Sequence, residues 1–136
     1  MSLVRDAMVR DPLTLEASAS AREAGERLVD PEVRAVLVCE EGRLVGVVTR
    51  KTLVREVVAA GRDPSTTTLR EIAEPPVHTL DADTPLEEAF RDLEERDLER
   101  VPVTEADGRL AGVLSRAVVQ RRLAEDEPEP EPDDPA

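Results

Sequence analysis

The sequence contains one eleven-residue pattern twice, and this internal repeat is the strongest constraint on its fold. Residues 40–50 read EEGRLVGVVTR and residues 106–116 read ADGRLAGVLSR, with six of the eleven positions identical. The similarity continues outward, since Val4-Arg5-Asp6 corresponds to Leu69-Arg70-Glu71. The repeat therefore covers most of the 136 residues and predicts two similar structural units.

Each copy is expected to contain, in order, a short helix, a short strand, an amphipathic helix, a β-hairpin and a final helix. Apolar residues at i, i+3, i+4 and i+7 indicate the amphipathic helices, and Asp107-Gly108 and Glu41-Gly42 indicate the hairpin turns. The short helices are expected at 3–8 and 69–73, the short strands at 13–15 and 78–80, the hairpin strands at 35–39, 44–48, 101–104 and 110–114, and the final helices from Arg50 and Arg116.

A unit of about 60 residues is marginally stable alone, so the two units are expected to pack together. The predicted fold class is α+β, with two β-α-β-β-α repeats packed through their sheets about a pseudo-twofold axis. We expect the repeats at 1–62 and 68–124, a linker at 63–67 and a tail at 125–136. The residues expected in the core are Val36, Leu37, Val45, Val47, Val103, Leu110 and Val113.

Composition argues against two classes of protein. The net charge of −13 disfavours nucleic-acid binding, which needs a basic face for the phosphates. Phe90 is the single aromatic residue, so bases would have no ring on which to stack. No apolar run approaches the roughly 18 residues of a membrane helix, so we expect neither a nucleic-acid nor a membrane partner.

Cysteine usage and the first residues favour a cytoplasmic protein. The single cysteine, Cys39, cannot form an internal disulfide, and no spacing typical of a metal or redox site is present. The opening MSLVRDAMVRDP lacks the long apolar core of a signal peptide. The segment from Glu125, EDEPEPEPDDPA, carries seven acids and no base, which predicts a disordered tail.

The repeat resembles a tandem pair of cystathionine-β-synthase-type (CBS) domains, also called a Bateman module. The resemblance rests on EGRLVGVVTR, DGRLAGVLSR, RVPV at 100–103 and TPLEEAF at 84–90, and it spans residues 3–123. It implies binding of an adenosine-containing ligand (AMP, ADP, ATP or S-adenosylmethionine) in clefts between the repeats. It also implies a regulatory role without catalysis, a homodimer, and signalling to a separate effector protein.

The family's ribose and phosphate motif is a Thr or Ser that closes the last strand, followed three residues later by Asp. Here the hydroxyl is present in both copies, as Thr49 and Ser115, and the acid is missing from both, as Thr52 and Val118. Thr52 can form one hydrogen bond but cannot grip a ribose diol as a carboxylate does. This departure weakens the expectation of ordinary ribose recognition.

The residues themselves indicate an anion site at two helix starts. Thr49 and Ser115 are placed to cap helices, where free N–H groups and the helix dipole favour a phosphate. Arg50 and Arg116 follow directly and are candidates for charge-assisted hydrogen bonds. The alternative is that the hydroxyls only cap and the arginines only face solvent.

An adenine-like base is expected against the first strand of each hairpin, and small polar residues of the early strands at the cleft mouth. The alternative for these residues is ordinary strand surface, with an edge-strand proline. The candidate ligand-binding residues are Thr14, Val36, Leu37, Thr49, Arg50, Thr52, Thr79, Val101, Pro102, Val103, Ser115 and Arg116.

Two functions remain open, a regulatory sensor of an adenosine-containing ligand and a dimerising interaction scaffold that has lost nucleotide binding. No nucleophile–base pair, glycine-rich phosphate loop or metal-ligand cluster supports an enzyme. His78, the single histidine, is expected at the surface or at a cleft rim. Arg5 and Arg70, at equivalent positions, are expected to point toward a central channel or to pair with Asp6 and Glu71.

Overall fold

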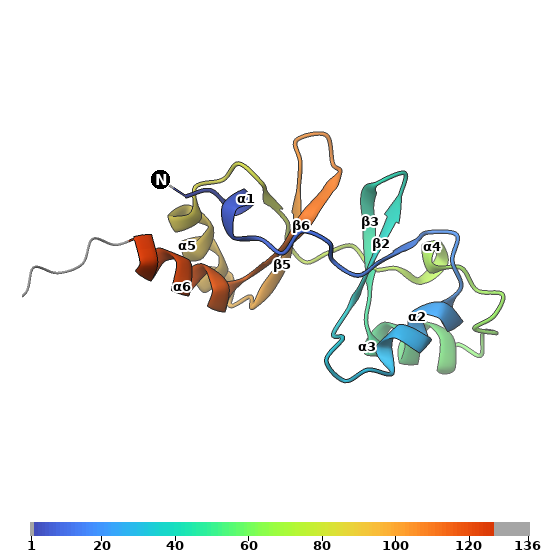
Figure 1. Cartoon of the computed structure of the whole chain (residues 1–136). Helices are drawn as coiled ribbons and strands as arrows, with labels where there is room; N and C mark the ends of the chain where they lie inside the picture. Colours follow the sequence, from blue (N-terminus) through green and yellow to red (C-terminus); the bar gives the residue numbers. More distant parts are fainter. Residues whose placement is uncertain (1, 127–136) are drawn as a thin grey trace, which may run out of the picture.

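The computed structural model describes residues 2–126, which form two three-stranded sheets with helices against them (Figure 1). The elements of the first repeat are α1 Val4–Ala7, β1 Thr14–Glu16, α2 Ala21–Leu28, β2 Val36–Glu40, β3 Arg43–Val48, α3 Arg50–Leu53 and the π-helix η1 Val54–Val58. Those of the second are α4 Leu69–Ile72, β4 Leu80–Asp81, α5 Leu86–Arg96, β5 Arg100–Thr104, β6 Leu110–Ser115 and α6 Arg116–Asp126. The first two residues of the predicted tail, Glu125 and Asp126, are thus helical, and residues 127–136 lie outside the described part of the chain.

The two sheets have the same topology, β1-β2-β3 and β4-β5-β6. In each, the first pair of strands is parallel and the hairpin pair antiparallel. Val36 pairs with Val48 and Val101 pairs with Leu114, so the additional residue of the second repeat lies within its hairpin turn. The predicted α+β fold of two like repeats is confirmed.

Each repeat has its own hydrophobic core, which lies between its sheet and its helices. The first core includes Val36, Val38 and Val48, and the second includes Val101, Val103 and Leu114. These residues alternate along their strands, because successive strand side chains point to opposite faces of a sheet. The main cores are therefore within the repeats and not between the two sheets.

The expected core was correct for three residues, Val36, Leu37 and Val103, which are buried. It was wrong for Val45, whose exposed fraction is 42%. Val47, Leu110 and Val113 are only partly buried. Val45 and Val47 point away from the face of Val48, and Val113 points away from that of Leu114.

The short leading helices exchange places between the repeats. Figure 1 shows α1 beside α5 and α6, and α4 beside α2. Val4 of α1 has no exposed surface and belongs to the second core, whereas Leu69 and Ile72 of α4 belong to the first. Each repeat therefore completes the core of the other.

Two chain segments carry this exchange, the first crossing segment (residues 8–13) and the second crossing segment (residues 73–79). Val9 forms an antiparallel bridge with Val113 of β6, and Glu74 forms the corresponding bridge with Val47 of β3. The second glycine of the repeated pattern makes this approach possible. A Cβ atom on Gly112 would lie 2.4 Å from the Val9 carbonyl oxygen, and one on Gly46 would lie 2.7 Å from the Ala73 Cβ.

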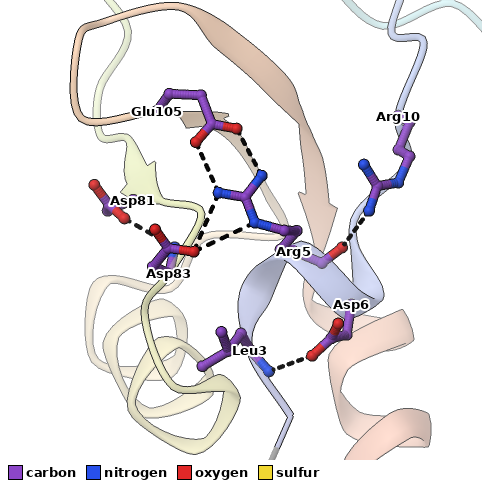
Figure 2. A network of polar contacts seen from close by, with 7 residues as sticks. All are labelled: Leu3, Arg5, Asp6, Arg10, Asp81, Asp83 and Glu105. Carbon is purple, nitrogen blue, oxygen red and sulfur yellow. Dashed lines mark hydrogen bonds and ion pairs between the residues drawn. The ribbon is translucent and has the colours of Figure 1, made fainter.

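An arginine on each exchanged helix contacts the other repeat, and Figure 2 shows the one on α1, Arg5. Arg5 donates from Nη1 and Nη2 to the two carboxylate oxygens of Glu105, at 2.7 Å each, and Nη2 lies 3.1 Å from Asp83 Oδ1. Arg70 donates in the same way to Glu40, which corresponds to Glu105 by strand register because the additional residue lies in the second hairpin turn. The prediction of local pairing with Asp6 and Glu71 was therefore wrong, because the partners lie across the exchange.

These arginines lower the pKa of the carboxyl groups that they contact. Hydrogen bonds from Arg5 hold the pKa of Glu105 below its ordinary value, and those from Arg70 lower the pKa of Glu40. The two clamps, Arg5–Glu105 and Arg70–Glu40, are thus charge-assisted links between the repeats.

Candidate functional site

A groove of about 550 Å³ runs between the two repeats. Its volume is in the range of small-molecule sites, roughly 300–1,000 Å³. Most of its lining residues are aliphatic or proline, while Phe90 packs against the second core instead. The sheets contribute Leu37, Val47, Val101, Pro102 and Val113, and the crossing segments contribute Val9, Pro12, Leu13, Glu74, Pro75, Pro76, Val77 and His78.

The end of the groove in the first repeat carries two hydroxyl groups that are bonded to each other. Thr49 is the N-cap of α3, its Oγ1 lies 3.1 Å from Thr52 Oγ1, and its backbone N–H donates to Thr52 Oγ1 at 3.0 Å. Thr52 is almost fully buried. Thr52 therefore closes a capping box, in which its hydroxyl takes the place of the usual acid.

The other end of the groove lacks this pair. Ser115 Oγ accepts a long hydrogen bond of 3.4 Å from the Val118 N–H, and the Val118 side chain has no polar atom to return one. The Ser115 hydroxyl proton is therefore available to a ligand. The two ends of the groove thus differ chemically, although the fold repeats.

The structure brings together six of the twelve candidate site residues. Leu37, Thr49, Thr52, Val101, Pro102 and Ser115 all line the groove. Of the other six, Val36 and Val103 lie in the cores without exposed surface, so their side chains do not reach it. Thr14 is exposed on β1, and Thr79 lines a separate cavity of about 400 Å³ between β4 and α5.

The two arginines expected to bind phosphate are engaged with nearby groups. Arg50 donates from Nη2 to the backbone oxygen of Asp30 at 2.7 Å. Arg116 pairs with Glu99, and its Nη1 lies 3.6 Å from Asp97 Oδ1. Neither arginine lines the groove. Anion binding by these two residues stays a prediction.

Two other arginines, Arg34 and Arg100, line the groove and were not predicted from the sequence. Arg100 lies directly across the β5–β6 hairpin from Ser115, and Arg34 precedes β2. Within residues 2–126 neither guanidinium forms a hydrogen bond or an ion pair, and both residues are exposed. Arg100 begins the first strand of its hairpin and Arg34 lies two residues before that of the other, a position that could have marked each as a candidate.

His78 lies where the groove meets the smaller cavity. Its Nε2 is 2.5 Å from Asp92 Oδ2 of α5, and this fixes the end of the second crossing segment. Hydrogen bonds from Arg96 and His78 lower the pKa of Asp92. His78 is thus a residue of the cleft rim, as expected, with a carboxylate partner that the sequence did not indicate.

The part of the chain that the structure describes contains no group of three His, Cys, Asp or Glu side chains placed to hold a metal ion. It also contains no helix that is long and apolar enough to cross a membrane. The polar side chains that line the groove are Thr49, Thr52, Ser115, Arg34, Arg100, Glu32, Glu74 and His78.

The chain is similar in sequence to known proteins. Hypoxic response protein 1 of Mycobacterium tuberculosis is 29% identical over 126 residues, which cover 92% of this chain and 87% of that protein. A crystal structure of Hypoxic Response Protein I with two coordinated zinc ions has a TM-score of 0.75 and 28% identity, with 90% of this chain and 99% of that chain covered.

A second solved structure, CBSX2 in complex with AMP, has a TM-score of 0.72 and 27% identity, with 93% of this chain and 98% of that chain covered. The family model of the CBS domain matches twice, at residues 4–59 and 69–125. These two matches coincide with the two repeats and take in all but the linking residues and the two ends. The chain belongs to the CBS-domain family, as a tandem pair.

Proposed function

We propose that the protein is a regulatory module that binds an adenosine-containing ligand in the groove between its repeats. The observation that carries this proposal is the combination of aliphatic groove walls with two unpaired arginines, Arg34 and Arg100. The similar structure of CBSX2 in complex with AMP supports the ligand class. We take AMP as the first ligand to test.

The chemistry of the groove matches the parts of a nucleotide. A purine is flat and apolar on its faces, so Leu37, Val101 and Val113 suit it as walls. A phosphate is best held by a guanidinium fork, which Arg100 offers beside the Ser115 hydroxyl. We therefore assign the phosphate to Arg100 and Ser115, in place of the arginines that follow the helix starts.

Ribose recognition is the part that this chain changes. The Thr49 and Thr52 hydroxyls are bonded to each other, so a sugar in that end of the groove competes with a capping box. We expect the ligand to bind chiefly through its base and phosphate, with one molecule in the second-repeat end.

The remaining roles belong to the same proposal. The chain is expected to act without catalysis, as a cytoplasmic homodimer that signals to a separate effector protein. The competing function is a dimerising scaffold that has lost nucleotide binding, and the absence of an acid at both Thr52 and Val118 favours it.

Calorimetric titration and thermal shift with AMP, ADP, ATP and S-adenosylmethionine test the proposal. A ligand at 100 times its dissociation constant that binds only the folded state stabilises it by about 2.7 kcal/mol. Arg100→Ala should weaken AMP binding about tenfold, as expected for the loss of a charge-assisted contact worth roughly 1.5 kcal/mol or more.

Arg27→Ala is the matched control, because Arg27 lies on α2 outside the groove and its loss changes the net charge equally. An unchanged affinity of Arg100→Ala for AMP would remove the phosphate assignment. A stable dimer that binds none of the four ligands would favour the scaffold.

A further inference from the structure

The first crossing segment has two roles in the structure, because it both walls the groove and connects α1 to the first repeat. Val9, Pro12 and Leu13 line the groove. The same residues follow directly on α1, which is seated on the second repeat. The seat of α1 and this wall of the groove are thus joined by a short stretch of chain.

Three sets of contacts hold α1 in place. Val4 is fully buried in the second core. The backbone N–H groups of Val4 and Arg5 donate to the carbonyl oxygens of Thr84 and Ala82, at 2.9 Å each. The Arg5 side chain adds its bidentate pair with Glu105 and its contact with Asp83 (Figure 2).

The first crossing segment is also hydrogen-bonded to β6. Val9 and Val113 exchange two backbone hydrogen bonds, at 2.9 and 3.0 Å, and both residues line the groove. At Gly112 this segment and the sheet lie too close together to admit a Cβ atom. The Val9 backbone is therefore held between the α1 seat on one side and β6 on the other.

We propose that Arg5 and Glu105 are positioning residues for the groove. The Arg5–Glu105 clamp and a ligand bound in the groove stabilise each other. This inference rests on the proposed function. Neither residue lines the groove, so each acts through the first crossing segment. Coupling between two sites is reciprocal. If the clamp increases the affinity for a ligand that contacts Val9 and Leu13, that ligand must stabilise the packing of α1 by the same free energy.

Glu105→Gln separates this coupling from a general effect of charge. The substitution removes one negative charge, which by long-range electrostatics alone would tighten the binding of an anion such as AMP. The clamp predicts the opposite, a weakening of about fivefold or more, the lower end of typical coupling between sites. Glu26→Gln is the matched control. Glu26 pairs with Arg22 on the surface of α2, and its substitution also removes one negative charge.

The experiment is calorimetric titration of AMP into the full chain and its two variants, at a temperature where thermal unfolding shows all three to be folded. Hydrogen exchange adds a local readout, because AMP should slow exchange of the Val4, Arg5 and Val9 amides in the unsubstituted protein. If Glu105→Gln proves unstable, Asp83→Asn removes only the outer contact, and Asp83 is well exposed.

The expected result is weaker AMP binding by Glu105→Gln, or a smaller weakening by Asp83→Asn, with binding by Glu26→Gln unchanged or tighter. Equal affinity of the Glu105 and Glu26 variants, with no change in exchange at Val9, would overturn the coupling and leave the proposed function intact. A protein that binds no AMP would overturn both.

Discussion

Gly46 and Gly112 show how single residues determine the path of this chain. Both are the second glycine of the repeated pattern, and each lies under the crossing segment that comes from the other repeat. Neither has a positive φ angle, so the requirement is for space and not for an unusual backbone conformation. The repeated pattern thus records a packing contact between the repeats as well as a hairpin.

Gly112→Ala should destabilise the fold by about 1–3 kcal/mol, as for other overpacked sites. The added Cβ would meet the Val9 backbone oxygen at 2.4 Å, and backbone cannot move aside as a flexible side chain can. Urea unfolding measures the change. Gly25→Ala is the control, because its Cβ would lie 3.8 Å from Leu53 Cδ1, an ordinary contact, in the interior of α2.

The free energy of unfolding of Gly25→Ala should rise by about 0.5–1 kcal/mol, since alanine is a better helix former than glycine. If both variants lost stability equally, the space under the first crossing segment would not be the cause.

The candidate site was predictable only in part at the residue scale. Thr49 and Ser115 follow from the motif, and the structure places both in the groove. Val36 could not be assigned to a face, because β2 is buried on both sides and gives no alternation to read. Val103 could have been, because burial alternates along β5 and places Val103 on the same side as Val101. Arg34 and Arg100 are marked only by their place near the start of a hairpin's first strand, which a surface arginine can share.

At the scale of the elements, the exchanged helices are held by ion pairs whose contribution depends on pH. In the folded chain Arg5 lowers the pKa of Glu105 below its ordinary value of about 4.3. A depressed folded pKa gives stability that is fully present above the unfolded value and is lost as pH falls through the folded value. The Arg5–Glu105 clamp should therefore weaken in acid.

The stability difference between the unsubstituted protein and Glu105→Gln tests this directly. Urea midpoints should differ by a constant amount from pH 7 to about pH 5, and the difference should shrink below about pH 4. Glu40 and Asp92, whose pKa values are also lowered, are present in both proteins and cancel. A difference that stays constant to pH 3 would show that Glu105 contributes through something other than its charge.

The elements themselves were predicted well, and their partners were not. The hairpins, the amphipathic helices and the short helix near Leu69 all follow from local periodicity and turn signals. Whether α4 packs on its own repeat or on the other one is decided by long-range contacts. The pairing of Arg70 with Glu40 across that exchange could not be predicted from the spacing of residues along the chain.

At the scale of the whole molecule, the unit that packs together differs from the unit that repeats. All of the buried residues of the first core lie between Ala17 and Ile72, so α4 completes it and α1 does not contribute. The second core consists of α1 together with the chain from Leu80 onward. A fragment cut at the packing unit should therefore be more stable than one cut at the sequence repeat.

Residues 12–76 contain the whole first core, whereas residues 1–66 lack the buried Leu69 and Ile72. Loss of a large buried aliphatic side chain costs about 2–5 kcal/mol, which is much of the stability of so small a unit. Circular dichroism during urea unfolding should show a cooperative transition for 12–76 and a weaker or absent one for 1–66. Equal midpoints would mean that α4 is dispensable to the first core.

The most direct test of the account is a methyl NMR titration of the full chain with AMP. Binding in the groove predicts saturable shifts at the methyl groups of Leu37, Val101 and Val113. It predicts none at Val29, the C-cap of α2, or at Val58 of η1, which are both exposed. Unchanged spectra at millimolar AMP, or shifts confined to those helices, would contradict it.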